Sequence, residues 1–282
     1  MKQGPAALGA ALGLGLLLNS CGPHSADPTP RPTSRYDGGQ GHLHTRIVNG
    51  WPVPAGELRG VVGLLFNGKN LPECTGTLIQ PDIVLTATHC VCHNPNAGIV
   101  AYVGDGPPRP GEPLYRAAAY VSRARCGDAI GPGKDLAVVR LVARVSTTNP
   151  IMLADDRLVR TATLFQITGF GATDFDGTVY RFDKLFAQVR PNELTTAEIV
   201  AGMNDSSDTC LGDSGGPLLV APNGGASVDF RTWKLAGVTS RAIDGAPRNC
   251  GYGTVFELLN NDARVWLGNA VAALRKAAAT PH

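Results

Sequence analysis

The 282-residue chain has few charged and few aromatic residues, 17% and 6%, and both charge signs are mixed along its length. It contains no block of Lys and Arg and no basic stretch interleaved with aromatics, so nucleic acid is not expected as a partner. Its net charge is only +2 at pH 7. With 43% hydrophobic residues, the composition is that of a globular protein and excludes a disordered chain.

Long apolar runs are missing except at the start, where Ala6 to Leu18 is almost uninterrupted and follows the positive charge of Lys2. The run is too short to span a bilayer comfortably, and it predicts an export signal over residues 1–20. The segment LNSC, ending at Cys21, is similar to the lipobox of bacterial lipoproteins, although Asn19 replaces the small residue usual there. Two interpretations stay open: a lipid on Cys21, or an ordinary secretory signal.

Cysteine is scarce, and its seven copies leave an even set of six once Cys21 is set aside. The six are Cys74, Cys90, Cys92, Cys126, Cys210 and Cys250. In an exported chain, which meets an oxidising compartment, six cysteines predict three disulfides. A zinc site is the alternative, but Cys90 and Cys92 form the only close pair and no second pair matches it.

Helical periodicity and internal repeats are also nearly absent. Residues 21–46 are rich in Pro, Gly, Ser and Thr and predict a flexible linker or pro-segment, in which His42 and His44 are interpreted as ordinary polar residues. From Ile47 onward, short apolar runs alternate with turn residues, which predicts an all-β fold. One amphipathic helix is expected at about 260–277.

Four short motifs point to one chemistry. The stretch IVLTATHC ends an apolar strand at His89, and GKDLAVVRL places Asp135 at the start of another. DTCLGDSGGP holds Ser214 in a glycine-rich turn, and RIVNG puts Arg46 before two β-branched residues at the edge of the linker. Each motif alone is common in structural roles, so the specificity lies in the set and its order. The set resembles the trypsin and chymotrypsin family of serine proteases from Arg46 to the final helix.

The resemblance implies a role for each motif. Ser214 would be the nucleophile, His89 the general base and then acid, and Asp135 the residue that orients the imidazole. The backbone amides of Gly212 and Ser214 would form the oxyanion hole. His93, in the loop CVCHNPN, is interpreted as a surface residue.

The resemblance also implies the architecture and the covalent frame. We expect two antiparallel six-stranded β-barrels, at about 47–150 and 151–258, with the site between them and the helix at the end. Cys74 and Cys90 match the disulfide that brackets the base. Cys210 and Cys250 match the one that brackets the specificity pocket, which leaves Cys92 with Cys126.

Activation by cleavage is a further implication. In the family, cutting after a basic residue, here between Arg46 and Ile47, frees an α-amino group that pairs with the aspartate before the nucleophile, here Asp213. The chain is therefore expected to be a zymogen, because a buried carboxylate without a partner is costly. If Cys21 carries a lipid, the same cut would release the protein from its anchor.

The residues expected at the specificity pocket include one that favours basic substrates and one that opposes them. Asp208 lies six residues before Ser214, where trypsin-like members keep the acid that binds Arg or Lys side chains. The walls are expected at Ser240, Ala242 and Gly253. The family's usual Ser-Trp-Gly is Ser240-Arg241-Ala242 here, and Arg241 turned toward Asp208 would neutralise it, so a non-basic specificity stays open.

The sequence therefore predicts an exported, trypsin-like serine endopeptidase that is secreted or held in the cell envelope. Its partners would be protein or peptide substrates and protein protease inhibitors, and we expect a monomer without metal or organic cofactor. The alternative is a non-catalytic binding protein on the same scaffold. An esterase of the α/β-hydrolase type is disfavoured, because no G-x-S-x-G elbow is present.

Overall fold

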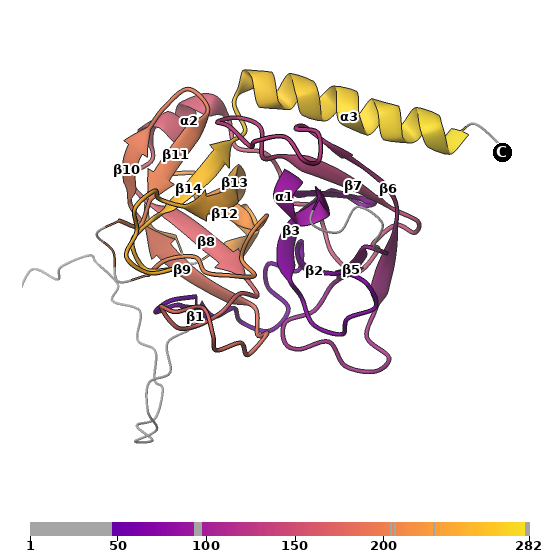
Figure 1. The fold of residues 1–282 in the computed structure, drawn as a ribbon, viewed down its shortest axis with the longest axis horizontal. Coiled ribbons are helices and arrows are strands. Elements are labelled where there is room, and N and C mark those ends of the chain that lie inside the picture. Colours follow the sequence, from indigo (N-terminus) through magenta and orange to yellow (C-terminus); the bar gives the residue numbers. More distant parts are fainter. Residues whose placement is uncertain (1–46, 93–97, 204, 206, 228, 280–282) are drawn as a thin grey trace, which may run out of the picture. The chain divides into compact units, whose positions relative to one another are not determined.

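The computed structural model describes residues 47–92, 98–203, 205, 207–227 and 229–279 (Figure 1). The expectations for Cys21, His42, His44, Arg46 and His93 lie outside the described residues.

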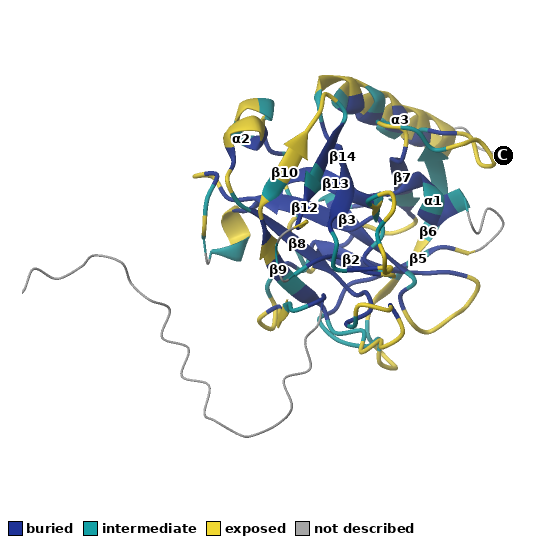
Figure 2. Cartoon of the chain, turned by 60° about the vertical axis from the view of Figure 1, so that its left-hand side comes forward, coloured by how far each residue is buried: buried dark blue, intermediate teal, exposed yellow. Residues whose placement is uncertain are grey.

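The first half of the described chain forms a closed antiparallel barrel. Its strands are β2 (Val61–Leu65), β3 (Cys74–Gln80), β4 (Ile83–Thr86), β5 (Val100–Tyr102), β6 (Leu114–Ser122) and β7 (Ala137–Leu141), in the order β2-β3-β4-β7-β6-β5. Pairing of β2 with β5 closes the ring, so no edge is left unpaired. Every residue of β2 and of β4 is buried, and β2 is dark blue in Figure 2.

The second half forms an eight-stranded antiparallel sheet. Its strands are β1 (Trp51–Pro52), β8 (Phe165–Gly169), β9 (Leu185–Val189), β10 (Pro191–Leu194), β11 (Glu198–Ala201), β12 (Pro217–Val220), β13 (Lys234–Ala242) and β14 (Thr254–Leu258), in the order β1-β9-β8-β12-β13-β14-β11-β10. The predicted all-β class is confirmed. The second sheet is a half-barrel with β1 and β10 at its edges, where a closed ring of six was expected. Its edge strand β1 comes from near the start of the described residues and pairs with β9.

Helices are few and short except at the end of the chain. Among the described residues they are α1 (Thr88–Cys92), α2 (Asp156–Thr161) and α3 (Asn261–Ala279), with one 3₁₀ turn, η1 (Phe230–Thr232). The apolar stripe Ala263, Leu267, Ala270 and Leu274 is buried, and α3 packs on β6 and β7 of the first barrel (Figure 1). Within the described ranges, no helix has the length and apolar character needed to cross a membrane.

Three disulfides fasten the loops of the fold. They join Cys74 to Cys90, Cys92 to Cys126, and Cys210 to Cys250. The pairing is the one expected from the sequence. Two of the bridges end on the short helix α1, which also carries His89.

Candidate active site

His89 and Asp135 come together because two neighbouring strands of the first barrel end side by side. Thr86, the last residue of β4, is opposite Ala137, the first residue of β7. His89 follows β4 on α1, and Asp135 precedes β7. His89 Nδ1 lies 2.8 Å from Asp135 Oδ2, so the imidazole and the carboxylate form a hydrogen-bonded ion pair when the ring is protonated.

The carboxylate of Asp135 is almost fully enclosed and well supplied with donors. It is 1% exposed, and its Oδ1 accepts a hydrogen bond of 2.9 Å from the backbone N–H of His89. Ser240 Oγ donates to Oδ2 at 2.6 Å. Burial disfavours the ionised form, but the bonds from His89 and Ser240 outweigh it and lower the pKa of Asp135. The group is therefore held as an anion against the ring.

Ser214 lies in a turn that only glycine neighbours allow. Gly212 and Gly215 have φ of 98° and 79°, in the region that favours glycine. A Cβ on Gly215 would lie 2.0 Å from Thr86 Oγ1, so the turn also needs glycine to pack on the first barrel. The carbonyl of Ser214 accepts from the backbone N–H of Thr75 at 2.8 Å and lies 3.5 Å from Cys90 Sγ. The serine is thus fixed beside α1.

The amides expected to form the oxyanion hole are available. Within the part of the chain that the structure describes, neither Gly212 N–H nor Ser214 N–H donates a hydrogen bond. The carbonyl of Gly212 is held in place by Thr75 Oγ1, which donates to it at 2.9 Å. An oxyanion binding there would meet donors that need no reorganisation.

A cavity of about 420 Å³ opens beside Ser214. Ser240 and Ala242, two of the expected wall residues, line it together with Thr209 and Thr254. Gly253, the third expected wall residue, and Asp208, the expected base, are not among the residues that line the cavity. They lie behind it.

Asp208 is 2% exposed, and the chain occupies both of its oxygens. Oδ1 accepts from Thr209 N at 2.9 Å and Thr254 Oγ1 at 2.7 Å, and Oδ2 accepts from Gly251 N at 2.8 Å and Gly253 N at 3.0 Å. Burial raises the pKa of Asp208 even though these four donors favour the anion. No described cation pairs with it.

Arg241 does not neutralise Asp208 in the structure. Its guanidinium donates to both carboxylate oxygens of Glu198, at 2.7 and 3.3 Å. Such a two-point pair fixes the guanidinium on β13 against β11. The wall of the cavity therefore carries a positive group that is already compensated.

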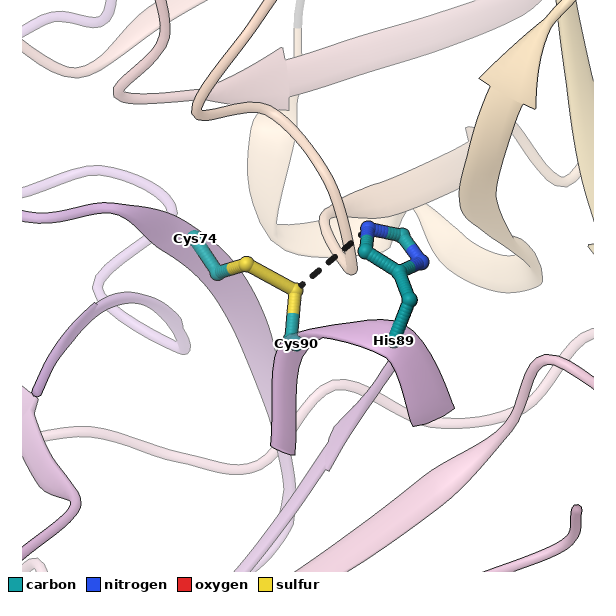
Figure 3. A group of neighbouring side chains, drawn as sticks. All are labelled: Cys74, His89 and Cys90. Atoms are coloured by element: carbon teal, nitrogen blue, oxygen red, sulfur yellow. Dashed lines mark hydrogen bonds between the residues drawn. A yellow bond between two sulfur atoms is a disulfide. The ribbon is translucent and has the colours of Figure 1, made fainter. Parts of the chain in front are cut away.

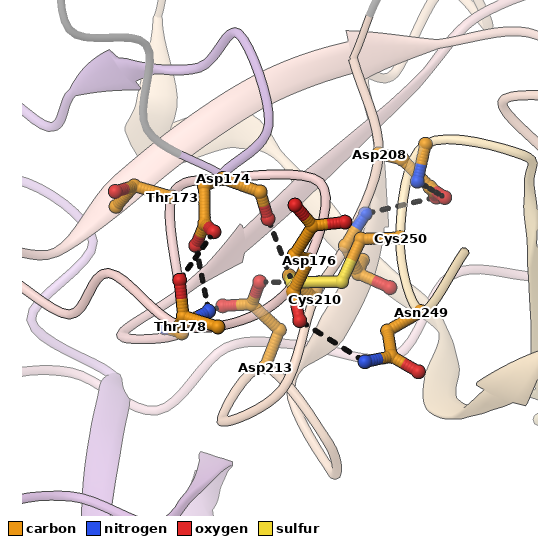
Figure 4. Close-up of a disulfide and its surroundings, with 12 residues drawn as sticks. Thr173, Asp174, Asp176, Thr178, Asp208, Cys210, Asp213, Asn249 and Cys250 are labelled. Carbon is orange, nitrogen blue, oxygen red and sulfur yellow. Dashed lines mark hydrogen bonds between the residues drawn. A yellow bond between two sulfur atoms is a disulfide. The ribbon is translucent and has the colours of Figure 1, made fainter.

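Asp213 is buried beneath the turn of Ser214, next to the disulfide Cys210–Cys250 (Figure 4). It accepts from Gly171 N at 2.8 Å and from Cys210 N at 2.9 Å. Burial raises its pKa to about 7, and the neighbouring Asp208 adds to the effect. No ion pair to Asp213 occurs among the described residues.

A protein-family model described as Trypsin matches residues 47–261, well over half of the chain. The chain belongs to the trypsin family. The match begins at Ile47, the residue expected to start the mature domain, and ends at the first residue of α3.

In this trypsin-family chain the one three-residue cluster of potential metal ligands within the described ranges is Cys74, His89 and Cys90 (Figure 3). The two sulfurs are bonded to each other, so neither is a thiolate that could hold zinc. His89 Nε2 lies 3.8 Å from Cys90 Sγ. The cluster belongs to the surroundings of His89.

Sequence reasoning missed three contributors to this region. Ser240 was expected only as a pocket wall, yet its hydroxyl bonds Asp135. Thr75 holds the backbone at both Gly212 and Ser214 from the first barrel. Glu257, fully buried on β14, carried no motif at all. Contacts between residues so distant in the chain leave no local signal.

Proposed function

We propose that the protein is a serine endopeptidase whose catalytic residues are His89, Asp135 and Ser214. The observation that carries the proposal is the 2.8 Å contact between His89 Nδ1 and a buried, ionised Asp135, next to the turn that presents Ser214. An aspartate anion in that position fixes the ring through Nδ1, so that the other nitrogen, Nε2, can act as the base.

The chemistry follows from these groups. Ser214 Oγ attacks the carbonyl carbon of the peptide while His89 Nε2 takes its proton, and the carbonyl oxygen becomes an oxyanion facing Gly212 N–H and Ser214 N–H. The C–N bond then breaks as the imidazolium gives its proton to the leaving amine. Water, deprotonated by His89, releases the acyl group from Ser214 and restores the enzyme.

For the substrate, we propose an Arg or Lys side chain before the scissile bond, bound through Asp208. The support is a buried carboxylate whose charge no described cation compensates, bonded to Thr254 in the lining of the cavity beside Ser214. A guanidinium or ammonium entering that cavity would supply the missing charge. The engagement of Arg241 by Glu198 leaves Asp208 free for this role.

For activation, we propose that cleavage between Arg46 and Ile47 gives Asp213 its partner. Ile47 is 0% exposed and has φ of 36°, a backbone region that β-branched residues rarely adopt. Such strain costs about 1–3 kcal/mol and would be relieved when the chain is cut before Ile47. The new α-amino group would offset the buried charge of Asp213.

We propose export as well, with residues 1–20 as signal, 21–46 as pro-segment and the peptidase domain from Ile47 onward. Three disulfides support an oxidising compartment. A lipid on Cys21 would make the precursor partition into detergent and the cleaved form remain in water. Partition of both forms into the aqueous phase would rule out the anchor.

The decisive experiment is hydrolysis of peptide amides bearing Arg, Lys, Phe, Leu or Ala before the scissile bond, with protein whose N-terminus is shown to be Ile47. We expect cleavage after Arg and Lys, and a loss of about 10⁴-fold or more in Ser214→Ala. Asp208→Asn should lower kcat/KM for Arg and Lys by about 100-fold. Its matched control is Asp244→Asn, at an exposed acid that lines the same cavity and should change little.

Two other results would contradict a part of the proposal. Turnover of Phe, Leu or Ala substrates that is unaffected by Asp208→Asn would keep the protease and reject the basic specificity. No turnover of any peptide by protein beginning at Ile47 would favour the binding-protein alternative.

A further inference from the structure

Glu257 is a buried carboxyl group that the proposed reaction does not use. It is the last residue but one of β14, is 0% exposed, and neither Oε atom has a hydrogen-bond partner of normal geometry within the described chain. Burying an ionised carboxylate without partners is costly, so such groups are rare and usually neutral.

The pairing of the sheet places a second acid next to it. In the register of β11 and β14, Glu257 is directly opposite Glu198, and opposite residues of an antiparallel pair project on the same face about 5 Å apart. On its other side Glu257 is opposite Val238 of β13. Arg241, also on β13, gives both of its donors to Glu198. Glu198 therefore holds the charge of the acid pair, and the proton is left to Glu257.

The third neighbour is Asp135, which reaches Glu257 from the first barrel. Burial raises the pKa of Glu257 to about 8, and the negative charges of Glu198 and Asp135 act in the same direction. The backbone N–H of Asp135 and the guanidinium of Arg241 act in the opposite direction. The carboxyl of Glu257 thus lies against the backbone of the residue that pairs with His89, and it is neutral at pH 7.

Ser240 connects Asp135 to β13, the strand that pairs with β14. It lies between Thr239, which is opposite Phe256 of β14, and Arg241, which is opposite Val255, and its hydroxyl bonds Asp135. Asp135 is therefore bonded from the second sheet by a hydroxyl on β13, and the carboxyl of Glu257 on the next strand, β14, is close enough to interact with Asp135 electrostatically without a hydrogen bond of normal geometry.

We propose that Glu257 is a positioning residue that, as a neutral acid, leaves the pair of Asp135 and His89 undisturbed, and that loss of its proton at alkaline pH disturbs this pair. Its catalytic consequence rests on the proposed function. An additional negative charge beside Asp135 would meet two carboxylates, those of Asp135 and Glu198, in a region of low dielectric. The expected response is displacement of β14 or of Asp135.

The proton on Glu257 can be tested without enzymatic activity. We would follow ¹³C-labelled Glu side-chain carboxyls by NMR in the Ser214→Ala protein from pH 4 to 10. One resonance should titrate near pH 8 and be missing from Glu257→Gln, and the His89 Nδ1–H signal should change over the same range only when Glu257 is present. Glu193→Gln, at an exposed position on β10, is the matched control and should keep both features. Titration of the Glu257 carboxyl below pH 6 would overturn the proposal.

The catalytic consequence is tested by the pH dependence of kcat/KM. With half ionisation near pH 8, activity controlled by Glu257 should fall about tenfold between pH 7 and pH 9. Glu257→Gln, which is neutral at every pH and keeps a donor and an acceptor, should lose this fall and retain activity at pH 7. Glu257→Leu, which is also neutral at every pH and fills a similar space, should lose the fall as well.

The outcomes separate the two proposals. An alkaline fall that is the same in wild type and Glu257→Gln belongs to another group, and it would reject the positioning role while the protease stands. A wild-type protein without peptidase activity would reject the proposed function, and the NMR titration would still decide the state of Glu257.

Discussion

At the scale of single residues, Asp208 and Asp213 are two buried acids in one loop that receive different numbers of hydrogen bonds. Asp208 receives four donors and Asp213 two, and burial raises the pKa of each. The two lie close enough for the charge of Asp208 to raise the pKa of Asp213 further. Each therefore gains from its own cation, which we propose to be a substrate side chain for Asp208 and the amino group of Ile47 for Asp213.

The precursor should reveal the uncompensated acid in its stability. Since the folded pKa of Asp213 is about 7 and the unfolded one is 3.8, the folded state holds the extra proton between these values. The free energy of unfolding attributable to Asp213 is therefore largest below pH 3.8 and falls by about 4 kcal/mol as pH rises through 7. Chemical unfolding of the uncleaved Ser214→Ala protein between pH 4 and 8 measures this slope.

Asp213→Asn should flatten that slope, because the amide does not titrate. Asp176→Asn, at an exposed position in the neighbouring loop, is the matched control and should keep the wild-type slope. Identical slopes for the wild type and Asp213→Asn would show that Asp213 is already paired in the precursor.

At the scale of secondary structure, α1 is too short to be stable by its own hydrogen bonds. A five-residue helix does not persist in water, and α1 is held instead by its connections. Thr88 Oγ1 donates to the carbonyl of Leu136 at 2.8 Å, and Cys90 and Cys92 anchor the other end. His89 thus gains a fixed position from covalent and side-chain bonds.

The bridge from Cys92 to Cys126 should contribute strongly to stability. It spans 34 residues, and closing a loop of that length removes conformational entropy worth about 4 kcal/mol from the unfolded chain. Replacing both cysteines by Ala should therefore lower the free energy of unfolding by about 2–4 kcal/mol. Urea unfolding of the Ser214→Ala protein with and without the two substitutions measures the loss, and a change below about 1 kcal/mol would contradict the assignment.

At the scale of the whole molecule, the two sheets are joined by a buried lysine. Lys184 precedes β9, its side chain is 0% exposed, and Nζ donates to the carbonyl of Leu58 at 3.0 Å and to Asp105 Oδ1 at 3.4 Å. Asp105 follows the last residues of β5, so the lysine connects the second sheet to the first barrel. Nζ also lies 5.7 Å from the centre of the Phe170 ring.

This lysine should make the protein more stable at high pH. Burial lowers the pKa of Lys184 to about 8 from 10.5, so between these values the unfolded chain binds the additional proton. The free energy of unfolding should then rise as pH increases from 8 to 10.5, the reverse of the trend set by Asp213 below pH 7. Lys184→Met should abolish the rise in urea unfolding curves. Lys69→Met, at an exposed lysine, should retain it.

The class of fold can be predicted from the amino-acid sequence alone, and so can the contact between His89 and Asp135. Alternating apolar runs and turns define antiparallel strands, and the motifs around His89, Asp135 and Ser214 are short enough to be read locally. The three disulfide pairs and the terminal helix also followed from the resemblance and the helical spacing. Such features depend on neighbours within a few residues or on a known pattern.

What compensates each buried charge depends on contacts that form in the folded protein. Arg241 bonds Glu198 and forms no ion pair with Asp208. Ser240 bonds Asp135, and Glu257 is buried near other acids without a hydrogen-bond donor among the described residues. The second sheet also takes β1 from the start of the chain and stays open, which strand patterns do not reveal. The physical reason is that burial and electrostatic pairing arise between segments about 40 to 160 residues apart, whose approach is fixed by strand register and packing.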